Sequence, residues 1–413
     1  MNIILVVGTR PNFMKIAPIW EAIARCNAEE EAPPFEALLV HTGQHYDHAM
    51  SQSFFDDLAL PRPDVNLGVG SGSHAEQTGK VMVAFERLLE KEHPDLVLVV
   101  GDVNSTMACT IAAKKLNIAV AHVEAGLRSG DMTMPEEINR KVTDFIADYL
   151  FTTDPLADAN LRAEGIPDHR IFFVGNVMID TLLNHRVRAS ASSILERLGF
   201  KSGPKVRPYG VVTLHRPSNV DHPETLGEIC RALEAVSETL PLVFPCHPRT
   251  EERMKSLGFG AFSGGSLTEG NRIALIPPLG YLDFLHLHAN AKVMLTDSGG
   301  IQEEATILGI PCLTLRENTE RPITITQGTN RLVGTSYETI VQTFQAVLNE
   351  QRSPNPRPEK WDGQAAERIV AALAEIAKRG EEGGGVAATG GAPTGDAPVR
   401  IGYEIVTWND LAR

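Results

Sequence analysis

Three acidic positions in the first half of the chain lie at or near the ends of apolar runs. Asp102 closely follows the run at residues 96–100, and Glu124 ends the next such run. Glu136 follows in a Pro-Glu-Glu segment. Because the carboxyl ends of parallel strands meet at one edge of a sheet, at least the first two should face a common edge. Carboxylates gathered there could remove and return protons, whereas each one alone could equally cap a helix or pair with an arginine.

Basic and histidine-containing segments follow apolar runs in both halves of the chain. The first run leads into Gly8, with Arg10 and Lys15 around the start of a predicted helix, where cations and backbone N–H groups suit a phosphate. Solvated basic side chains at a helix start are an equally frequent explanation. His215 and His247 each follow a run in the second half, with an arginine close behind. Both halves therefore present groups that could bind an anion.

The most specific local feature is the segment TDSGGIQEE. Ser298, Gly299 and Gly300 follow an apolar run and open a helix. The glycines allow a diphosphate to approach the backbone, and a helix N-terminus favours negative charge. Glu304, about one turn further on, could accept hydrogen bonds from ribose hydroxyls, and Arg321 adds a cation nearby in sequence. The alternative interpretation of this segment is a structural turn followed by a helix cap.

Other motifs predict less. Residues 70–75 fit G-x-G-x-x-A, but no apolar run leads directly into them, so we expect a loop there. The five cysteines are scattered without a C-x-x-C pair, which is typical of reduced thiols in a cytosolic protein. The thirteen histidines show no spacing typical of metal ligands. We therefore expect neither a cofactor nor a metal.

The elements that must position these residues form two series of strands alternating with helices. Continuously apolar strands separated by helices indicate parallel sheets covered on both faces, so the predicted fold class is α/β with two Rossmann-like, doubly wound domains facing a central cleft. The predicted strands are residues 2–7, 37–42, 96–100, 120–123, 149–152 and 171–174, then 209–214, 242–246, 273–276, 293–296 and 311–315. The helices include 14–25, 76–91, 106–115, 223–237 and 300–308.

The predicted domain boundaries follow from changes in composition along the chain. We expect a first domain at 1–183, a linker region at 184–208 and a second domain at 209–378, whose last helix could pack back on the first domain. Residues 379–413 begin with a Gly-, Ala-, Thr- and Pro-rich stretch that is typical of a flexible linker, followed by a tail.

Length and charge limit the functional classes. A chain of 413 residues with 43% hydrophobic residues fits two domains. The formal net charge of -14 argues against nucleic acid as the main partner but leaves room for a local cluster of cations. No apolar stretch approaches the ~20 residues of a membrane span, and the first apolar run is too short for a signal peptide. We expect a cytoplasmic protein that acts on soluble substrates.

Taken together, the ordered motifs resemble the non-hydrolysing UDP-N-acetylglucosamine 2-epimerases over residues 1–373. The matching segments are GTRPNFMK, HTGQH, GDVNST, HVEAGLR, PEEINR, VGNVMID, TLHR, LTDSGGIQEE and TERP. The resemblance implies a GT-B-like fold, a homodimer, and interconversion of UDP-GlcNAc and UDP-ManNAc for surface polysaccharide synthesis. It also implies elimination of UDP to a 2-acetamidoglucal, followed by re-addition with inversion at C2.

The resemblance also implies roles for residues at matching positions. Proton transfer would belong to the carboxylates Asp102, Glu124 and Glu136, and His215 would stabilise or protonate the leaving diphosphate. The substrate and UDP site would contain Arg10, Lys15, Gln44, His247, Ser298, Gly299, Gly300, Glu304 and Arg321.

Two segments depart from the common pattern, after His45 and after Arg216. They are similar to relatives that act on a UDP-2,3-diacetamido-glucuronate, which is therefore the alternative substrate, with Arg128 as a candidate cation for its carboxylate. More distant alternatives are a hydrolysing epimerase, a GT-B glycosyltransferase and a non-catalytic nucleotide-sugar sensor.

Overall fold

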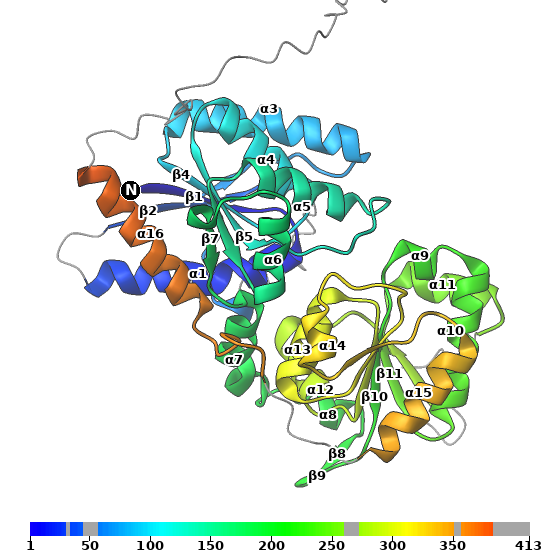
Figure 1. Cartoon of the computed structure of the whole chain (residues 1–413). Helices are drawn as coiled ribbons and strands as arrows, with labels where there is room; N and C mark the ends of the chain where they lie inside the picture. Colours follow the sequence, from blue (N-terminus) through cyan, green and yellow to red (C-terminus); the bar gives the residue numbers. More distant parts are fainter. Residues whose placement is uncertain (30–33, 44–56, 260–271, 351–356, 383–413) are drawn as a thin grey trace, which may run out of the picture.

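Two parallel sheets, one in each half of the chain, form the framework of the protein (Figure 1). The computed structural model describes residues 1–29, 34–43, 57–259, 272–350 and 357–382. The first sheet contains, in spatial order, β3 (Val65–Asn66), β2 (Glu36–His41), β1 (Asn2–Val7), β4 (Leu96–Val100), β5 (Ala119–Ala125), β6 (Tyr149–Thr152) and β7 (Ile171–Phe173). The second contains β12 (Ile273–Ile276), β11 (Leu242–Pro245), β10 (Gly210–Thr213), β13 (Val293–Thr296), β14 (Cys312–Thr314) and β15 (Asn330–Leu332).

Helices cover both faces of each sheet. The helices of the first half are α1 (Arg10–Glu29), α3 (His74–Glu92), α4 (Asn104–Lys115), α5 (Pro135–Ile146), α6 (Pro155–Ala163), α7 (Val177–Ala189) and a 3₁₀ turn at Asp168–Arg170. Those of the second half are α8 (Ile194–Arg197), α9 (Pro217–Val220), α10 (Pro223–Ser237), α11 (Pro248–Ser256), α12 (Tyr281–Ala289), α13 (Gly299–Leu308), α14 (Ile323–Thr326), α15 (Tyr337–Asn349) and α16 (Ala365–Glu382).

Strand β1 shows why the strands read as unbroken apolar runs. Successive side chains of a strand point to opposite faces of the sheet. Ile3 and Leu5 join the core shared with α1 and α7, whereas Ile4 and Val6 join the core shared with α3 and α4. With both faces buried, residues 3–7 of this strand are all apolar, and the covering of both faces predicted from the sequence is confirmed.

The predicted strands all appear, with ends that shift by at most a few residues, and the structure adds short elements that were not predicted. The strands β3 and β15 lie at sheet edges and contain two and three residues. An antiparallel hairpin of β8 (Lys201–Ser202) and β9 (Lys205–Val206) forms within the stretch predicted as a linker. The G-x-G-x-x-A segment is mostly loop, as expected, and its Ser73 caps α3 in a capping box with Glu76.

Helix α16 returns from the second half of the chain to the first sheet, where it packs on α1 and α7 (Figure 1). Two buried polar contacts dock this return. The Trp361 indole Nε1 donates to the Thr153 carbonyl at 3.0 Å. The Asp180 carboxylate on α7 accepts the backbone N–H of Ala366 at 2.7 Å, at the start of α16. Within the described residues, no helix is long and apolar enough to cross a membrane.

Candidate active site

Glu124 lies at an irregularity of strand β5. The pairing of β5 with β6 shifts register between Val123 and Ala125, so Glu124 is an extra residue in a β-bulge. Its φ of 74° is in the left-handed region, which costs a residue other than glycine about 1–3 kcal/mol. The bulge turns the carboxylate out of the regular pleat and toward the other half of the molecule.

Two buried cations hold this carboxylate from opposite halves of the chain. Lys15 Nζ, from α1, lies 2.7 Å from Glu124 Oε2, and Arg321 Nη2 lies 3.1 Å from Oε1. Glycine at position 101 makes room for the lysine, because a Cβ there would lie 2.6 Å from Lys15 Nζ. The Glu124 carboxylate therefore joins the two domains by ion pairs that water hardly reaches.

Arg321 contacts two further carboxylates besides that of Glu124. Its Nε donates to Glu303 Oε1 at 2.7 Å, and its Nη1 donates to Glu320 Oε1 at 2.5 Å. Arg316 Nη2 reaches the other Glu320 oxygen at 2.8 Å. Burial opposes ionisation of Glu320, but the two arginines outweigh it and hold the pKa of that carboxyl well below its usual range. The site is thus a dense, alternating array of buried charges.

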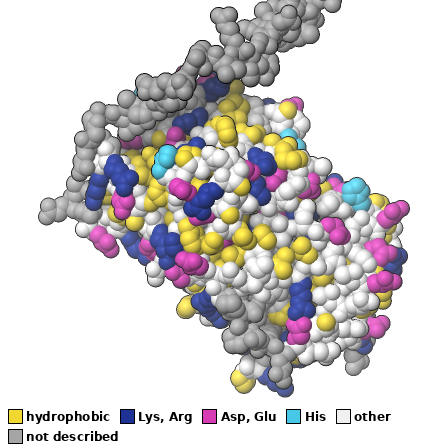
Figure 2. Space-filling model, in the orientation of Figure 1, with side chains coloured by type: hydrophobic (Ala, Val, Ile, Leu, Met, Phe, Trp, Pro, Cys, Tyr) yellow, Lys and Arg dark blue, Asp and Glu magenta, His cyan; other side chains and the backbone are white. Residues whose placement is uncertain are grey.

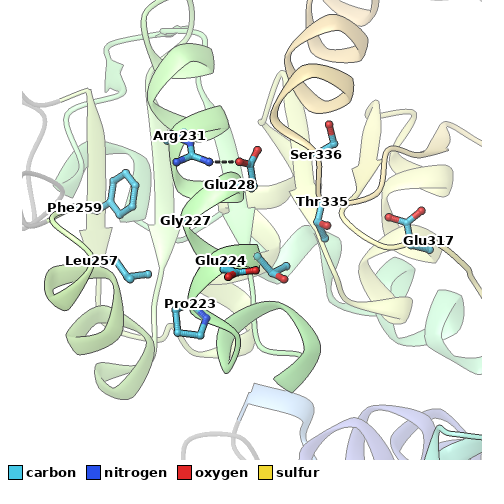
Figure 3. Close-up of a pocket in the computed structure, with 11 residues that line it drawn as sticks. Pro223, Glu224, Gly227, Glu228, Arg231, Leu257, Phe259, Glu317, Thr335 and Ser336 are labelled. Atoms are coloured by element: carbon cyan, nitrogen blue, oxygen red, sulfur yellow. Dashed lines mark hydrogen bonds and ion pairs between the residues drawn. The ribbon is translucent and has the colours of Figure 1, made fainter.

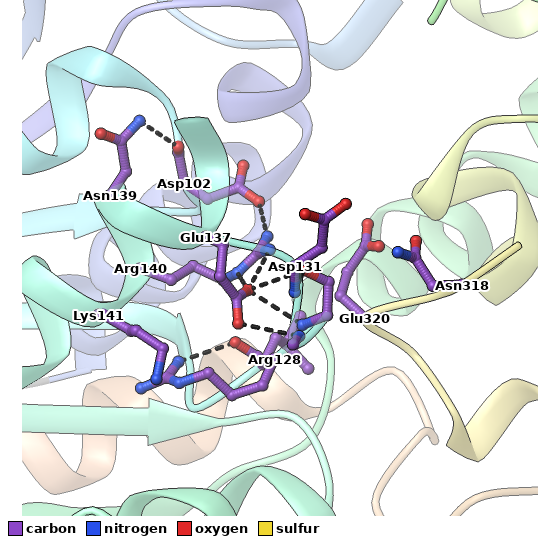
Figure 4. A network of polar contacts seen from close by, with 12 residues as sticks. Asp102, Arg128, Asp131, Glu137, Asn139, Arg140, Lys141, Asn318 and Glu320 are labelled. Atoms are coloured by element: carbon purple, nitrogen blue, oxygen red, sulfur yellow. Dashed lines mark hydrogen bonds and ion pairs between the residues drawn. The ribbon is translucent and has the colours of Figure 1, made fainter. Parts of the chain in front are cut away.

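Asp102 belongs to the same region through Arg140 (Figure 4). Arg140 Nη1 lies 2.5 Å from Asp102 Oδ2, and Nη2 lies 2.7 Å from Glu137 Oε2. The Asp102 side chain stays 21% exposed, so a ligand can reach it. Glu136, the second residue of α5, is half-buried and acts electrostatically on Arg216 of the second half. The three predicted carboxylates therefore all lie where the two halves face each other.

His215 contacts a buried carboxylate, that of Asp297, for which no role was predicted from the sequence. Its Nδ1 lies 2.9 Å from Asp297 Oδ1, and its ring is exposed to solvent. Asp297 is fully buried and also accepts the backbone N–H groups of His215 and Arg216 and the Asn219 amide. Its position directly after β13 is the signal that could have revealed it. The carboxylate thereby orients the ring.

The N-terminus of α13 offers unoccupied donors beside a cation. Within the described part of the chain, the backbone N–H groups of Gly299 and Gly300 have no acceptor, while that of Ser298 donates to the Thr296 hydroxyl. A Cβ at Gly299 would lie 2.3 Å from Arg321 Nη1, which shows how closely the arginine approaches this turn. Helix dipole and guanidinium together make an anion site here.

Glu304 forms a separate buried pair with a histidine. Its Oε2 lies 3.2 Å from His288 Nδ1 on α12, and both side chains are almost fully buried. The structure therefore places Glu304 one turn along α13 from the glycines, as the sequence indicated, with one oxygen engaged by a histidine. That arrangement leaves the other oxygen to accept a ligand hydroxyl.

The loop after β1 differs from the expected phosphate site. The Asn12 side-chain oxygen accepts the backbone N–H groups of Gly8 and Thr9, at 3.2 and 2.9 Å, and its amide donates to the Val100 carbonyl. The N–H groups that we expected to be free for a phosphate are therefore satisfied internally. Lys15 is likewise engaged by Glu124 rather than solvated.

Few contacts are described for the three remaining predicted site residues. His247 is exposed and caps α11, with its Nδ1 accepting the Arg249 backbone N–H at 3.4 Å. Arg10 is the first residue of α1, and its side chain, like the whole of Gln44, lies outside the described part of the structure. In that described part, no group of three or more His, Cys, Asp or Glu residues is arranged to hold a metal ion.

A separate hollow of about 780 Å³ lies in the second domain, between α10 and the segment before α15 (Figure 3). Its lining includes Glu224, Glu228 and Glu317, and Glu228 pairs with the lining residue Arg231. This acidic lining repels a diphosphate, and its residues take no part in the Glu124 cluster. We therefore place the candidate active site at the cluster, between the two sheets.

Known proteins are similar to this chain over most of its length. The model of the UDP-N-acetylglucosamine 2-epimerase family matches residues 27–374. The chain is 43% identical to the UDP-N-acetylglucosamine 2-epimerase of Methanocaldococcus jannaschii over 90% of this chain and 99% of the relative. It is 37% identical to the UDP-2,3-diacetamido-2,3-dideoxy-D-glucuronate 2-epimerase of Pseudomonas aeruginosa, over 91% and 100%.

The structure is also similar to solved structures. A crystal structure of the M. jannaschii UDP-GlcNAc 2-epimerase in complex with UDP-GlcNAc and UDP superposes with a TM-score of 0.79 at 41% sequence identity, covering 91% of this chain and all of that one. The predicted GT-B-like arrangement of two parallel sheets is thereby confirmed.

Proposed function

This chain belongs to the UDP-N-acetylglucosamine 2-epimerase family, and we propose that it interconverts UDP-GlcNAc and UDP-ManNAc by inversion at C2. One observation carries the proposal: a strained, buried carboxylate, Glu124, meets Arg321 beside the open N–H groups of α13. An acid–base group and an anion site thus adjoin each other. That is what a reaction needs when it moves a proton at carbon and releases a diphosphate nearby.

The C2–H bond of the sugar has no adjacent carbonyl to acidify it, so direct deprotonation has a high barrier. In the proposed path a carboxylate takes the C2 proton while the C1–O bond to the diphosphate breaks. The C–H electron pair becomes the C1–C2 double bond of a 2-acetamidoglucal, and the C1–O pair leaves with UDP. UDP then adds back at C1 as a proton arrives at the opposite face of C2. Asp102, Glu124 and Glu136 are the proposed acid and base groups.

The same path explains the cations. Negative charge grows on the diphosphate as the C1–O bond breaks, and preorganised donors that face this charge lower the barrier. We assign this role to Arg321 and the N-terminus of α13, with His215, oriented by Asp297, donating to the leaving oxygen. Glu304 would accept the ribose hydroxyls. Arg10, Gln44 and His247 are proposed as further substrate contacts from the family pattern alone.

We also propose that two copies of the chain form a homodimer through α3 and α5. Val83 on α3 is 51% exposed, and Ile138 and Phe145 on α5 are 43% and 69% exposed. Figure 2 shows hydrophobic side chains at the surface of this domain. Replacing Phe145 with Glu should convert the dimer to a monomer in light-scattering chromatography, whereas V187E, at the even more exposed Val187 of α7, should leave it unchanged. A dimer that survives F145E would exclude this face.

We place the reaction in the cytoplasm, supported by the state of the cysteines. All five are free thiols, and four are buried. Burial raises the pKa of Cys109, Cys230 and Cys312, which keeps these thiols protonated and unreactive. A reducing compartment suits a chain with this chemistry. The product would there supply precursors of cell-surface polysaccharide.

The P. aeruginosa relative keeps UDP-2,3-diacetamido-glucuronate as the second candidate substrate. The cation first suggested for its carboxylate is already occupied: Arg128 pairs with Asp144 at 2.7 Å and Glu164 at 2.6 Å. Arg216 is better placed, because its side chain is 22% exposed and its own ion pair, with Glu320, is longer, at 3.5 Å. If the uronate is the natural substrate, R216M should impair its turnover far more than that of UDP-GlcNAc.

Proton NMR in deuterated water tests the proposal. Purified enzyme and UDP-GlcNAc should give UDP-ManNAc with deuterium at C2 and little free UDP. E124Q should bind the substrate but lose the exchange, and D221N, a change at an exposed aspartate of the second domain, should exchange normally. Bound UDP-GlcNAc without exchange, in an enzyme that does turn over the uronate, would assign the second substrate. Binding without exchange of either would refute the epimerase function.

A further inference from the structure

Three buried carboxylates share the guanidinium of Arg321. Glu303 faces its Nε, Glu320 its Nη1 and Glu124 its Nη2, at 2.7, 2.5 and 3.1 Å. Each of the three residues is at most 3% exposed. One positive charge cannot compensate three buried negative charges, and an uncompensated buried carboxylate is costly enough to bind a proton instead.

The other cations of the site decide which carboxyl takes that proton. Glu124 has a second cation in Lys15, and Glu320 has a second in Arg316. Within the described residues, the Glu303 carboxyl pairs only with the shared arginine, and its Oε2 is buried without a hydrogen-bond partner. Glu303 is therefore the least compensated of the three.

The electrostatics of Glu303 agree with its geometry. Burial raises the pKa of its carboxyl to about 7, Arg321 opposes the rise, the charge of Glu124 adds to it, and Lys15 opposes it. These are the charged groups that face Glu303 from α1, β5 and the segment before α14. A change of pH near neutrality thus changes the charge directly behind the arginine.

We propose that Glu303 carries the proton of this cluster and that its protonation controls how tightly Arg321 binds the diphosphate of a UDP-sugar. The inference rests on the proposed function, because it assumes that the diphosphate meets Arg321. When Glu303 is neutral, the arginine offers its charge to the ligand. When Glu303 ionises, a further negative charge lies beneath the anion site, and binding weakens. Glu303 is fully buried, so it acts through Arg321 as a positioning residue.

Calorimetric titration with UDP-GlcNAc tests this coupling. The diphosphate of this ligand is a diester, so the ligand itself does not titrate near neutrality. For the wild-type protein we expect the Kd to rise about three- to tenfold between about pH 6 and 8.5, with net proton uptake on binding measured in buffers of different ionisation enthalpy. In E303Q the amide can still accept from Arg321 but cannot titrate, so this pH dependence and the proton uptake should both disappear.

Two variants separate titration from anchoring. E303D keeps a titratable group but reaches less far toward Arg321, so it should bind more weakly at every pH and retain the pH dependence. E338Q makes the matching change at an exposed glutamate of α15 and should follow the wild type. Melting curves establish that each variant is folded.

The outcomes also separate this inference from the proposed function. If folded E303Q keeps the wild-type pH dependence of Kd while C2 exchange proceeds in the wild type, the inference fails and the epimerase function stands. If wild-type protein binds no UDP-GlcNAc at any pH, the proposed function fails first, and the inference fails with it.

Discussion

Replacing Asp297 with Asn should slow turnover through His215 while leaving the fold in place. Asp297 uses Oδ2 for the backbone N–H groups of His215 and Arg216 and for the Asn219 amide, and Oδ1 for the His215 ring. Asparagine can place its oxygen at the Oδ2 position and keep all three of those donors. Its NH₂ group then faces the ring, whose Nδ1 must accept rather than donate and loses its hydrogen bond to a carboxylate.

The magnitude follows from that one contact. A hydrogen bond to a buried charged group contributes about 1.5–3 kcal/mol, and solvent screening favours the lower end because the His215 side chain is 64% exposed. The expected loss is therefore about 10- to 30-fold in kcat. Unfolding free energy should fall by less than about 2 kcal/mol, since the backbone donors stay satisfied.

The assay is C2 exchange under saturating UDP-GlcNAc, together with denaturant unfolding. D221N provides a matched change at an exposed aspartate of the same domain and should exchange like wild type. A double variant H215N/D297N should be no slower than H215N alone, because both act through one ring. If folded D297N turns over within threefold of wild type, or if the two losses multiply, the orienting role is refuted.

Further predictions concern the anion site, the base and the docking of α16. G299A should weaken UDP-GlcNAc binding at least tenfold by calorimetry, because its Cβ would lie 2.3 Å from Arg321 Nη1. A Cβ at Gly300 would have its nearest neighbour at 3.6 Å, an ordinary contact distance. G300A should therefore have a smaller effect. K15M removes one partner of a buried ion pair and should cost about 3–5 kcal/mol in denaturant unfolding; a loss below about 1 kcal/mol would show that the pair is not closed in solution. Burial raises the pKa of Asp180 to about 6, whereas the pKa of an aspartate in an unfolded chain is about 4. The protonated side chain therefore contributes stability that is fully present below about pH 4 and is lost as the pH rises through about 6. The free energy of unfolding of D180N, measured by denaturant, should therefore exceed that of wild type by about 1–3 kcal/mol at about pH 8, and this gain should vanish near pH 4. A gain that persists at pH 4 would contradict this sign.

The framework of the fold could be predicted from the sequence because its signal is local. Strand β4, which is buried on both faces, is apolar at every position, and the polar Asp102 closely follows its end. Strands as short as β3 carry no such pattern. Their pairing depends on a neighbouring strand that is already in place.

The site was predictable in its residue types and less so in its connections. The ends of strands indicated Asp102 and Glu124 as candidates, but nothing near Glu303 in sequence shows that it pairs with an arginine 18 residues further on. The same limit explains the loop after β1, where Asn12 satisfies backbone donors that a local reading leaves free. Contacts between distant segments determine charge and hydrogen bonding, and a local pattern does not contain them.

The return of α16 to the first domain has a consequence for how the chain folds during its synthesis on the ribosome. The core beneath α1 contains Ile3 and Leu5 from the first strand together with Trp361, Ile369 and Leu373 from the end of the described chain. Domains generally fold one after another as they leave the ribosome. The first domain of this chain cannot complete its core in that way, because part of the core comes from residues near 361–373. It must hold an apolar face open while the entire second domain is synthesised.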